Sequence, residues 1–83
     1  MLMNPNVIPS PAPGIFWHRP DPDAEPFLVA GQTVEAGQTI GVIEVMKMFV
    51  DVQADRAGAF KRYVAENGES VPMGAALVEL GDG

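Results

Sequence analysis

The chain has 83 residues and no cysteine. Neither a disulfide nor a thiolate metal site can therefore stabilise the fold, so its stability must come from the packing of apolar side chains. A domain of this size buries only about 60% of the surface that its unfolded chain exposes, which predicts a modest core. The absence of disulfides is also compatible with the cytoplasm, where we expect the protein to be.

Positive charge is scarce as well. Lysine and arginine together number 5 against 11 aspartates and glutamates, for a net charge of -6. This balance opposes binding to nucleic acid or to anionic lipid. Residues 1–30 lack a basic start followed by a continuous apolar run, so they predict neither a secretory signal nor a membrane span. We therefore expect no nucleic acid partner and no membrane association.

Groups that could perform catalysis or bind a metal are few. His18 is the single histidine, and carboxylates without histidine or cysteine give weak transition-metal sites. No glycine-rich phosphate loop precedes a helix. We predict no metal site and no catalytic residues, so the chain is not expected to be an enzyme by itself. His18 is interpreted as a residue of a strand end or loop.

Proline and glycine, with 8 and 9 copies, interrupt the whole chain. No uninterrupted window is long enough for a helix of three turns, whereas short runs rich in Val, Ile and Phe recur between turn signals. This pattern predicts an all-β fold. Five aromatic residues are predicted to lie in the core or at its edge: Trp17, Phe27, Phe49, Phe60 and Tyr63.

The sequence also repeats itself. "GQTVEAGQTIGVI", residues 31–43, aligns with "GESVPMGAALVEL", residues 68–80, so that Gly31 meets Gly68 and Gly37 meets Gly74. Two such copies, each too small to bury its apolar face alone, predict two similar half-sheets related by a pseudo-twofold axis. A flattened β-sandwich or barrel of about eight short strands follows.

The most apolar window, "GVIEVMKMFVDV" at 41–52, holds one lysine, Lys47. A cation there must reach water, which a hairpin tip allows, so we predict strands at about 41–45 and 48–53 with Met46 and Lys47 at the turn. Two-residue turns favour Asn-Gly, because their central residues need positive φ. A turn built against this preference is expected where function fixes the residues.

The two methionines beside Lys47 have two possible roles. They could fill the core, since methionine packs into irregular gaps, or they could present a surface. Strand alternation starting from Val45 leaves at least one of them facing outward. We favour at least one exposed methionine next to the lysine.

The same window carries a family resemblance. "EVMKMF" at 44–49, with the repeat segments around it, "SPAPG" at 10–14 and "NGESV" at 67–71, resembles the biotinyl domain of biotin carboxyl carrier proteins, the carrier component of acetyl-CoA carboxylase. The resemblance implies two four-stranded antiparallel sheets with pseudo-twofold symmetry, and biotin attached to Lys47. It also implies that the biotin-attaching ligase recognises Glu44, Val45, Met46 and Met48. Val45 stands where the family usually has alanine.

The segment "IFWHRPDPDAEPFLVA" at 15–30 is longer than a direct connection needs and is rich in Pro and Asp. Prolines remove N–H donors, so this segment cannot form a ladder and is predicted to be an exposed loop. It resembles the protruding thumb of bacterial acetyl-CoA carboxylase carriers, placed here at about 19–26. Its charged residues are candidates for a docking surface or for ordinary solvated loop positions: Arg19, Asp21, Asp23 and Glu25.

The resemblance further implies a domain at 10–81 after a short extension at 1–9. Its implied partners are biotin protein ligase, biotin carboxylase and carboxyltransferase, between which the carrier shuttles a carboxyl group to an acyl-CoA. Two alternatives stay open. A lipoyl domain shares the hairpin lysine, although acidic or small residues usually flank it, and an unmodified interaction module could have kept the fold.

Overall fold

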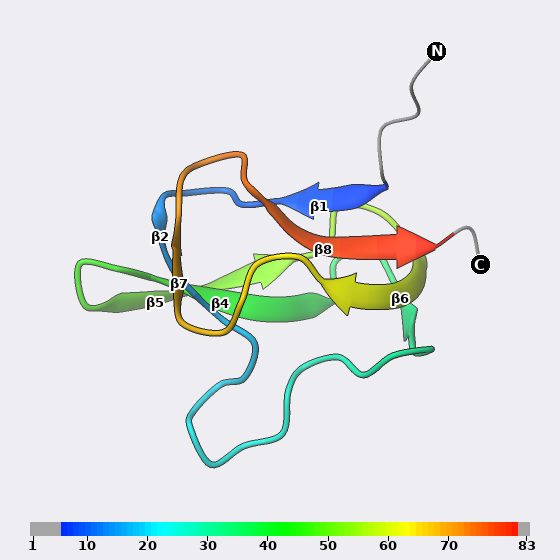
Figure 1. The fold of residues 1–83 in the computed structure, drawn as a ribbon, viewed down its shortest axis with the longest axis horizontal. Coiled ribbons are helices and arrows are strands. Elements are labelled where there is room, and N and C mark those ends of the chain that lie inside the picture. Colours follow the sequence, from blue (N-terminus) through cyan, green and yellow to red (C-terminus); the bar gives the residue numbers. More distant parts are fainter. Residues whose placement is uncertain (1–5, 82–83) are drawn as a thin grey trace.

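The computed structural model describes residues 6–81 of the chain, which form eight strands (Figure 1). They are β1 (Val7–Pro9), β2 (Gly14–Trp17), β3 (Thr33–Val34), β4 (Thr39–Val45), β5 (Met48–Gln53), β6 (Gly58–Tyr63), β7 (Glu69–Val71) and β8 (Ala76–Gly81). No helix occurs within these described residues, so the all-β prediction is confirmed.

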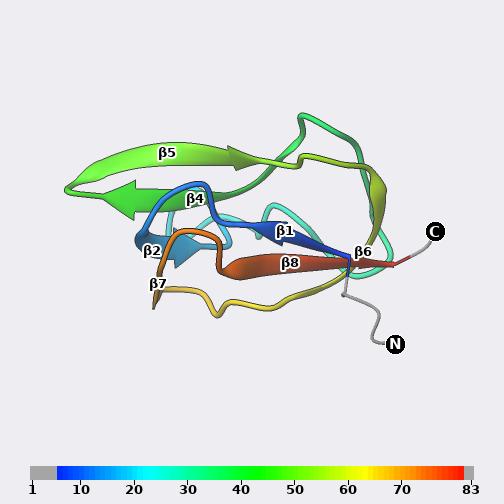
Figure 2. The same cartoon turned by 90° about the horizontal axis from the view of Figure 1, so that it is seen from above.

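The strands form two four-stranded sheets, in the orders β1-β8-β6-β3 and β5-β4-β2-β7. Every neighbouring pair is antiparallel. The two sheets have equivalent orders, in which β1 corresponds to β5, β8 to β4, β6 to β2 and β3 to β7. Two flat layers with pseudo-twofold symmetry were predicted, and they are what the structure contains (Figure 2).

The internal repeat explains this symmetry at the level of single residues. Gly31 and Gly68 have φ of 87° and 85°, and Gly37 and Gly74 have φ of 88° and 86°. These left-handed values suit glycine, which has no Cβ to clash. The repeated glycines therefore fix equivalent turns around β3 and β7, before β4 and β8 respectively.

The core lies between the two layers. Phe16 of β2, Ile43 of β4 and Leu77 of β8 are fully buried, as is Val34 of β3. Each such side chain contributes roughly 1.5–3 kcal/mol relative to an exposed one. Gly41 lets β4 pass close over this core, because a Cβ there would lie 2.6 Å from Cε1 of Phe16.

The β4–β5 hairpin extends to one end of the molecule, whose principal extents are 39 × 27 × 20 Å (Figures 1 and 2). β1 begins and β8 ends toward the opposite end. Of the predicted extension at 1–9, residues 1–5 lie outside the described residues, whereas Val7–Pro9 form β1 and pair with β8.

The connection from β2 to β3 has no strand and projects from the sheets as a loop (Figure 1). Five of the six residues from 20 to 25 are exposed: Pro20, Asp21, Pro22, Asp23 and Glu25. The exposed, thumb-like loop predicted at about 19–26 is therefore present, and it is called the thumb below.

One prediction about the core is wrong. Phe49 was expected to be at least half-buried, but 65% of its surface is exposed. Phe49 lies opposite Glu44 in the β4–β5 register, on the outer face of its sheet, and β5 is an edge strand. The other four aromatic residues of that prediction are buried or partly buried, as expected: Trp17, Phe27, Phe60 and Tyr63.

Candidate functional site

The hairpin tip is a two-residue turn. Val45 pairs with Met48, and the two residues between them have positive φ, 51° at Met46 and 71° at Lys47. Positive φ at both central positions is the pattern of a type I′ turn, which matches the twist of the flanking strands. Neither residue is glycine, so each costs about 1 kcal/mol or more. The predicted turn is confirmed, and it is formed by residues that type I′ turns do not favour.

Lys47 stands alone at this tip. Its side chain is exposed, and it takes part in none of the ion pairs within residues 6–81. Lys61, by contrast, lies on β6 with its Nζ 3.8 Å from the Glu79 carboxylate. The turn thus leaves the amine exposed, where a partner can reach it.

Large apolar side chains next to this amine in the chain are exposed. Met46 is 91% exposed and Met48 is 69% exposed, and Phe49 and Val50 are exposed as well. These four residues are called the apolar tip. At least one outward methionine was predicted, and both are outward. Large apolar side chains left in water close together are typical of contact surfaces, so the apolar tip is a candidate for one.

Two further residues of the predicted recognition set lie at the base of the tip. Glu44 is partly buried, and its Oε1 accepts a hydrogen bond of 3.3 Å from Nε1 of Trp17 on β2. Val45 is partly buried and packs against the core. The four residues predicted to be recognised by the ligase therefore fall into two groups. Met46 and Met48 are exposed, whereas Glu44 and Val45 are partly buried at the base of the hairpin.

The thumb is fixed at its base by His18. The His18 backbone N–H donates to Oδ1 of Asn67 at 2.7 Å, and the His18 carbonyl accepts from the N–H of Phe27 at 2.8 Å. The imidazole stacks on the ring of Tyr63, with centroids 3.7 Å apart. Its Nε2 lies 2.7 Å from the carbonyl of Ala65 and therefore carries the proton, since a carbonyl only accepts.

His18 is a loop residue, as predicted, but sequence reasoning missed this anchoring role. Burial lowers the pKa of its imidazole, outweighing the hydrogen bond to the Ala65 carbonyl. The lowered pKa favours the neutral imidazole in this partly buried position against Tyr63.

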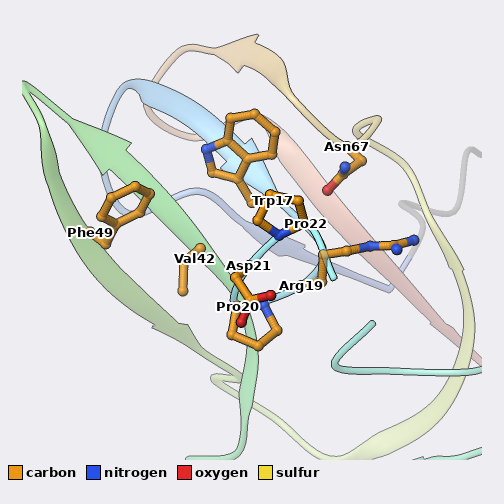
Figure 3. A pocket seen from close by; sticks show the side chains of 8 residues that line it. All are labelled: Trp17, Arg19, Pro20, Asp21, Pro22, Val42, Phe49 and Asn67. Atoms are coloured by element: carbon orange, nitrogen blue, oxygen red, sulfur yellow. The ribbon is translucent and has the colours of Figure 1, made fainter. Parts of the chain in front are cut away.

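A pocket of about 480 Å³ lies between the thumb and the outer face of the β5-β4-β2 sheet (Figure 3). Trp17, Val42 and Phe49 come from the sheet, and the thumb and the β6–β7 turn supply Arg19, Pro20, Asp21, Pro22 and Asn67. Aromatic, valine and proline side chains make most of its walls. Pockets of this size and polarity commonly receive small ligands.

The four charged residues predicted as a docking set have two kinds of surroundings in this loop. Arg19 and Asp21 line the pocket, whereas Asp23 and Glu25 do not line it and are exposed. Arg19 donates from Nη1 to the Ala24 carbonyl at 3.4 Å, and Asp21 Oδ1 accepts from the N–H of Asp23 at 2.9 Å. These contacts brace the thumb from within.

Metal-binding clusters and membrane-spanning helices are two other classes of feature to consider in residues 6–81. No group of three or more His, Cys, Asp or Glu side chains in this range could hold a metal ion. Nor does the described chain have a helix that is long and apolar enough to cross a membrane.

Comparison with known proteins places this geometry in a family. The model of the family described as "Biotin-requiring enzyme" matches residues 6–80, which is nearly the whole chain. The chain belongs to this biotin-requiring family. The resemblance inferred from the residues around Lys47 is thereby confirmed.

Relatives within the biotin-requiring family are carrier proteins. The chain is similar to the biotin carboxyl carrier protein of acetyl-CoA carboxylase from Haemophilus influenzae, 32% identical over 75 residues, which are 90% of this chain and 48% of that protein. The protein of the same name from Cyanidium caldarium is 36% identical over 71 residues, 86% of this chain and 47% of that protein. The chain thus spans about half the length of these relatives.

Among solved structures, the chain is similar to part of the urea carboxylase of Kluyveromyces lactis. The TM-score is 0.74 and the identity 25%, with 98% of this chain and 6% of that chain covered. This likeness supports the two-sheet fold.

Proposed function

We propose that this domain is the carrier of an acyl-CoA carboxylase, acting on acetyl-CoA, and that it bears biotin as an amide on Nζ of Lys47. The observation that carries the proposal is the tip itself. A lysine is held outward by a left-handed two-residue turn between two exposed methionines, in a member of the biotin-requiring family. The names of the relatives agree with it.

The residues at and near the hairpin tip are compatible with a biotin attached to Lys47. Lys47 is exposed, as are Met46 and Met48 on either side of it. On the same hairpin, Phe49 forms one wall of the pocket under the thumb. Trp17 and Val42 would offer further apolar walls to the biotin ring, and Arg19 would supply a polar edge.

Loading requires a biotin protein ligase, which presents an activated biotin carboxyl group. A lysine amine is mostly protonated at neutral pH, so the ligase must remove a proton before Nζ of Lys47 can form the amide. We propose that Met46 and Met48 contact the ligase and that Glu44 and Val45 hold them in place. The hairpin needs only to keep the amine accessible.

Biotin, when bound, supplies a ureido nitrogen that accepts and releases a carboxyl group. The domain then presents this group at biotin carboxylase and afterwards at carboxyltransferase. Its contribution is position and effective concentration, because it has no acid–base group at the tip. We therefore propose that the chain has no catalytic activity of its own.

The thumb is proposed as a docking loop, in which Asp21, Asp23 and Glu25 offer negative charge to a basic partner surface. Arg19 would line the pocket and would not contact the partner surface. The domain is proposed for 10–81, and β1, in the extension before it, pairs with β8. A cytoplasmic location is proposed for the carrier.

Reconstituted carboxyl transfer tests the function. The chain is loaded by a ligase and mixed with biotin carboxylase, carboxyltransferase, ATP, bicarbonate and acetyl-CoA. We expect carboxylated acetyl-CoA that depends on the loaded chain and is absent with Lys47→Arg. Failure of the loaded chain beside an active control carrier would reject the carboxylase role, and loading by a lipoate ligase instead would favour a lipoyl domain.

A further inference from the structure

The two methionines at the apolar tip are unusually open to chemistry at sulfur. Met46 is 91% exposed and Met48 is 69% exposed. Met46 lies in the two-residue turn itself, and Met48 begins β5, which is an edge strand of its sheet. Neither thioether is protected by the core, and peroxides oxidise accessible thioethers to sulfoxides.

Resting on the proposed function, we propose that Met46 and Met48 form a reversible oxidation site, whose sulfoxides prevent the loading of Lys47. The oxidant is a hydroperoxide, with hydrogen peroxide as the simplest case. The sulfur lone pair attacks the peroxide O–O bond, an S–O bond forms, and the peroxide is reduced to water. A thiol-dependent methionine sulfoxide reductase reverses the step, forming a disulfide and water.

The consequence for loading comes from polarity. The apolar tip presents two flexible thioethers beside Phe49 and Val50, a surface suited to burial against a partner. A sulfoxide carries a strong dipole that must keep a hydrogen bond when it is buried. Docking of the oxidised tip in a ligase groove shaped for thioethers would leave that dipole unpaired, and binding would weaken.

The chain contains a matched control for this chemistry. Met73 is 68% exposed, close to the value of Met48, but it lies in the turn between β7 and β8. That turn is away from the β4–β5 tip in both views (Figures 1 and 2). Oxidation of Met73 should therefore occur at a similar rate to that of Met48 without affecting Lys47.

The experiment treats the purified chain with graded hydrogen peroxide and then removes the peroxide, so that the ligase is never exposed to it. Peptide mapping gives the sulfoxide content at Met46, Met48 and Met73. The initial rate of biotin loading is then measured with ligase, biotin and ATP. We expect the rate to fall on the order of tenfold as the tip is oxidised, and to recover after treatment with sulfoxide reductases and thiol.

Variants assign the effect to residues. The double variant Met46→Leu, Met48→Leu keeps the apolar bulk but cannot form a sulfoxide, so its own loading rate should not change after peroxide. Met73→Leu should load like the parent and remain sensitive. If the double variant loads too slowly to measure, recovery of the oxidised parent by the reductases decides the question.

Three results are distinguishable. Unchanged loading of a chain mapped as oxidised at both tip methionines would overturn the oxidation site. A loss that the reductases do not reverse would also overturn it, because the lesion would lie elsewhere. Failure of the untreated chain to load would instead reject the proposed function.

Discussion

Asn67 Oδ1 accepts a hydrogen bond of 2.7 Å from the backbone N–H of His18, a residue 49 positions away in the chain. The bond ties the start of the thumb to the β6–β7 turn. Gly68 adds a second link, since its N–H donates to the carbonyl of Phe16 at 2.7 Å. The turn and the base of the thumb thus form one unit beneath the pocket.

Loss of the Asn67 acceptor should loosen the thumb. Asn67→Ala leaves the His18 N–H without its partner, so we expect a decrease of about 1 kcal/mol in the free energy of unfolding. Amide exchange in residues 18–27 should accelerate more than exchange in β4. Asn67→Asp keeps an acceptor and should behave like the parent. Equal protection of the thumb in the alanine variant would show that the bond does not anchor it.

The His18 imidazole should make stability depend on pH. Burial lowers the pKa of His18 from 6.5; Arg19 also lowers it, while Glu66 and the Ala65 carbonyl raise it. The unfolded chain therefore binds a proton more readily, and unfolding becomes easier as the pH falls below about 6.5. We expect the urea midpoint to decrease between pH 7.5 and 5.8.

His18→Gln serves as the control for this pH effect, because it removes the titrating ring. The parent should lose more stability than this variant over the same range. Identical losses would show that carboxylates, and not His18, set the pH dependence.

The Tyr63 hydroxyl compensates for an irregularity in β4. The β4–β5 register shifts between Thr39 and Gly41, and the hydroxyl donates to the carbonyl of the intervening Ile40 at 2.8 Å. Tyr63→Phe should cost about 1 kcal/mol, measured by urea unfolding. Burial also raises the pKa of Tyr63 to about 12.

Because the unfolded phenol ionises near pH 10, stability from Tyr63 should be complete below that pH and should disappear as the pH rises toward 12. Absorbance of the folded chain should show no phenolate near pH 10. A phenolate signal at that pH in the folded chain would contradict the buried hydroxyl.

Relief of the turn strain should stabilise the fold and abolish loading. The double variant Met46→Asn, Lys47→Gly has the residues that type I′ turns favour, so we expect a gain of about 1–2 kcal/mol in urea unfolding. Gly74→Ala is the converse control. Its φ is 86° with no atom within 4 Å of an added Cβ, so any loss there reports left-handed strain alone. No gain in the double variant would mean that the tip is unstrained.

Local sequence signals were sufficient for the tip. A lysine in an apolar window must reach water, and the strand boundaries at Val45 and Met48 followed from that requirement. The repeated glycines likewise predicted the paired turns, because positive φ is a property of single residues.

Features that depend on long-range packing could not be predicted. Alternation places Phe49 and Val42 on one face of a sheet but does not say whether another layer covers that face. The pocket forms only because the thumb folds back over those residues, and His18 meets Asn67 and Tyr63 from distant parts of the chain. No periodicity in the sequence encodes such contacts.

The central claim is that Lys47 is the attachment site, and peptide mapping after exposure to biotin protein ligase, biotin and ATP tests it most directly. Lys61, paired with Glu79, is the internal control. We predict a mass increase of one biotinyl unit located on Lys47 alone, and no increase for Lys47→Arg. An unmodified chain under a ligase that loads a control carrier, or biotin mapped to Lys61, would contradict the claim.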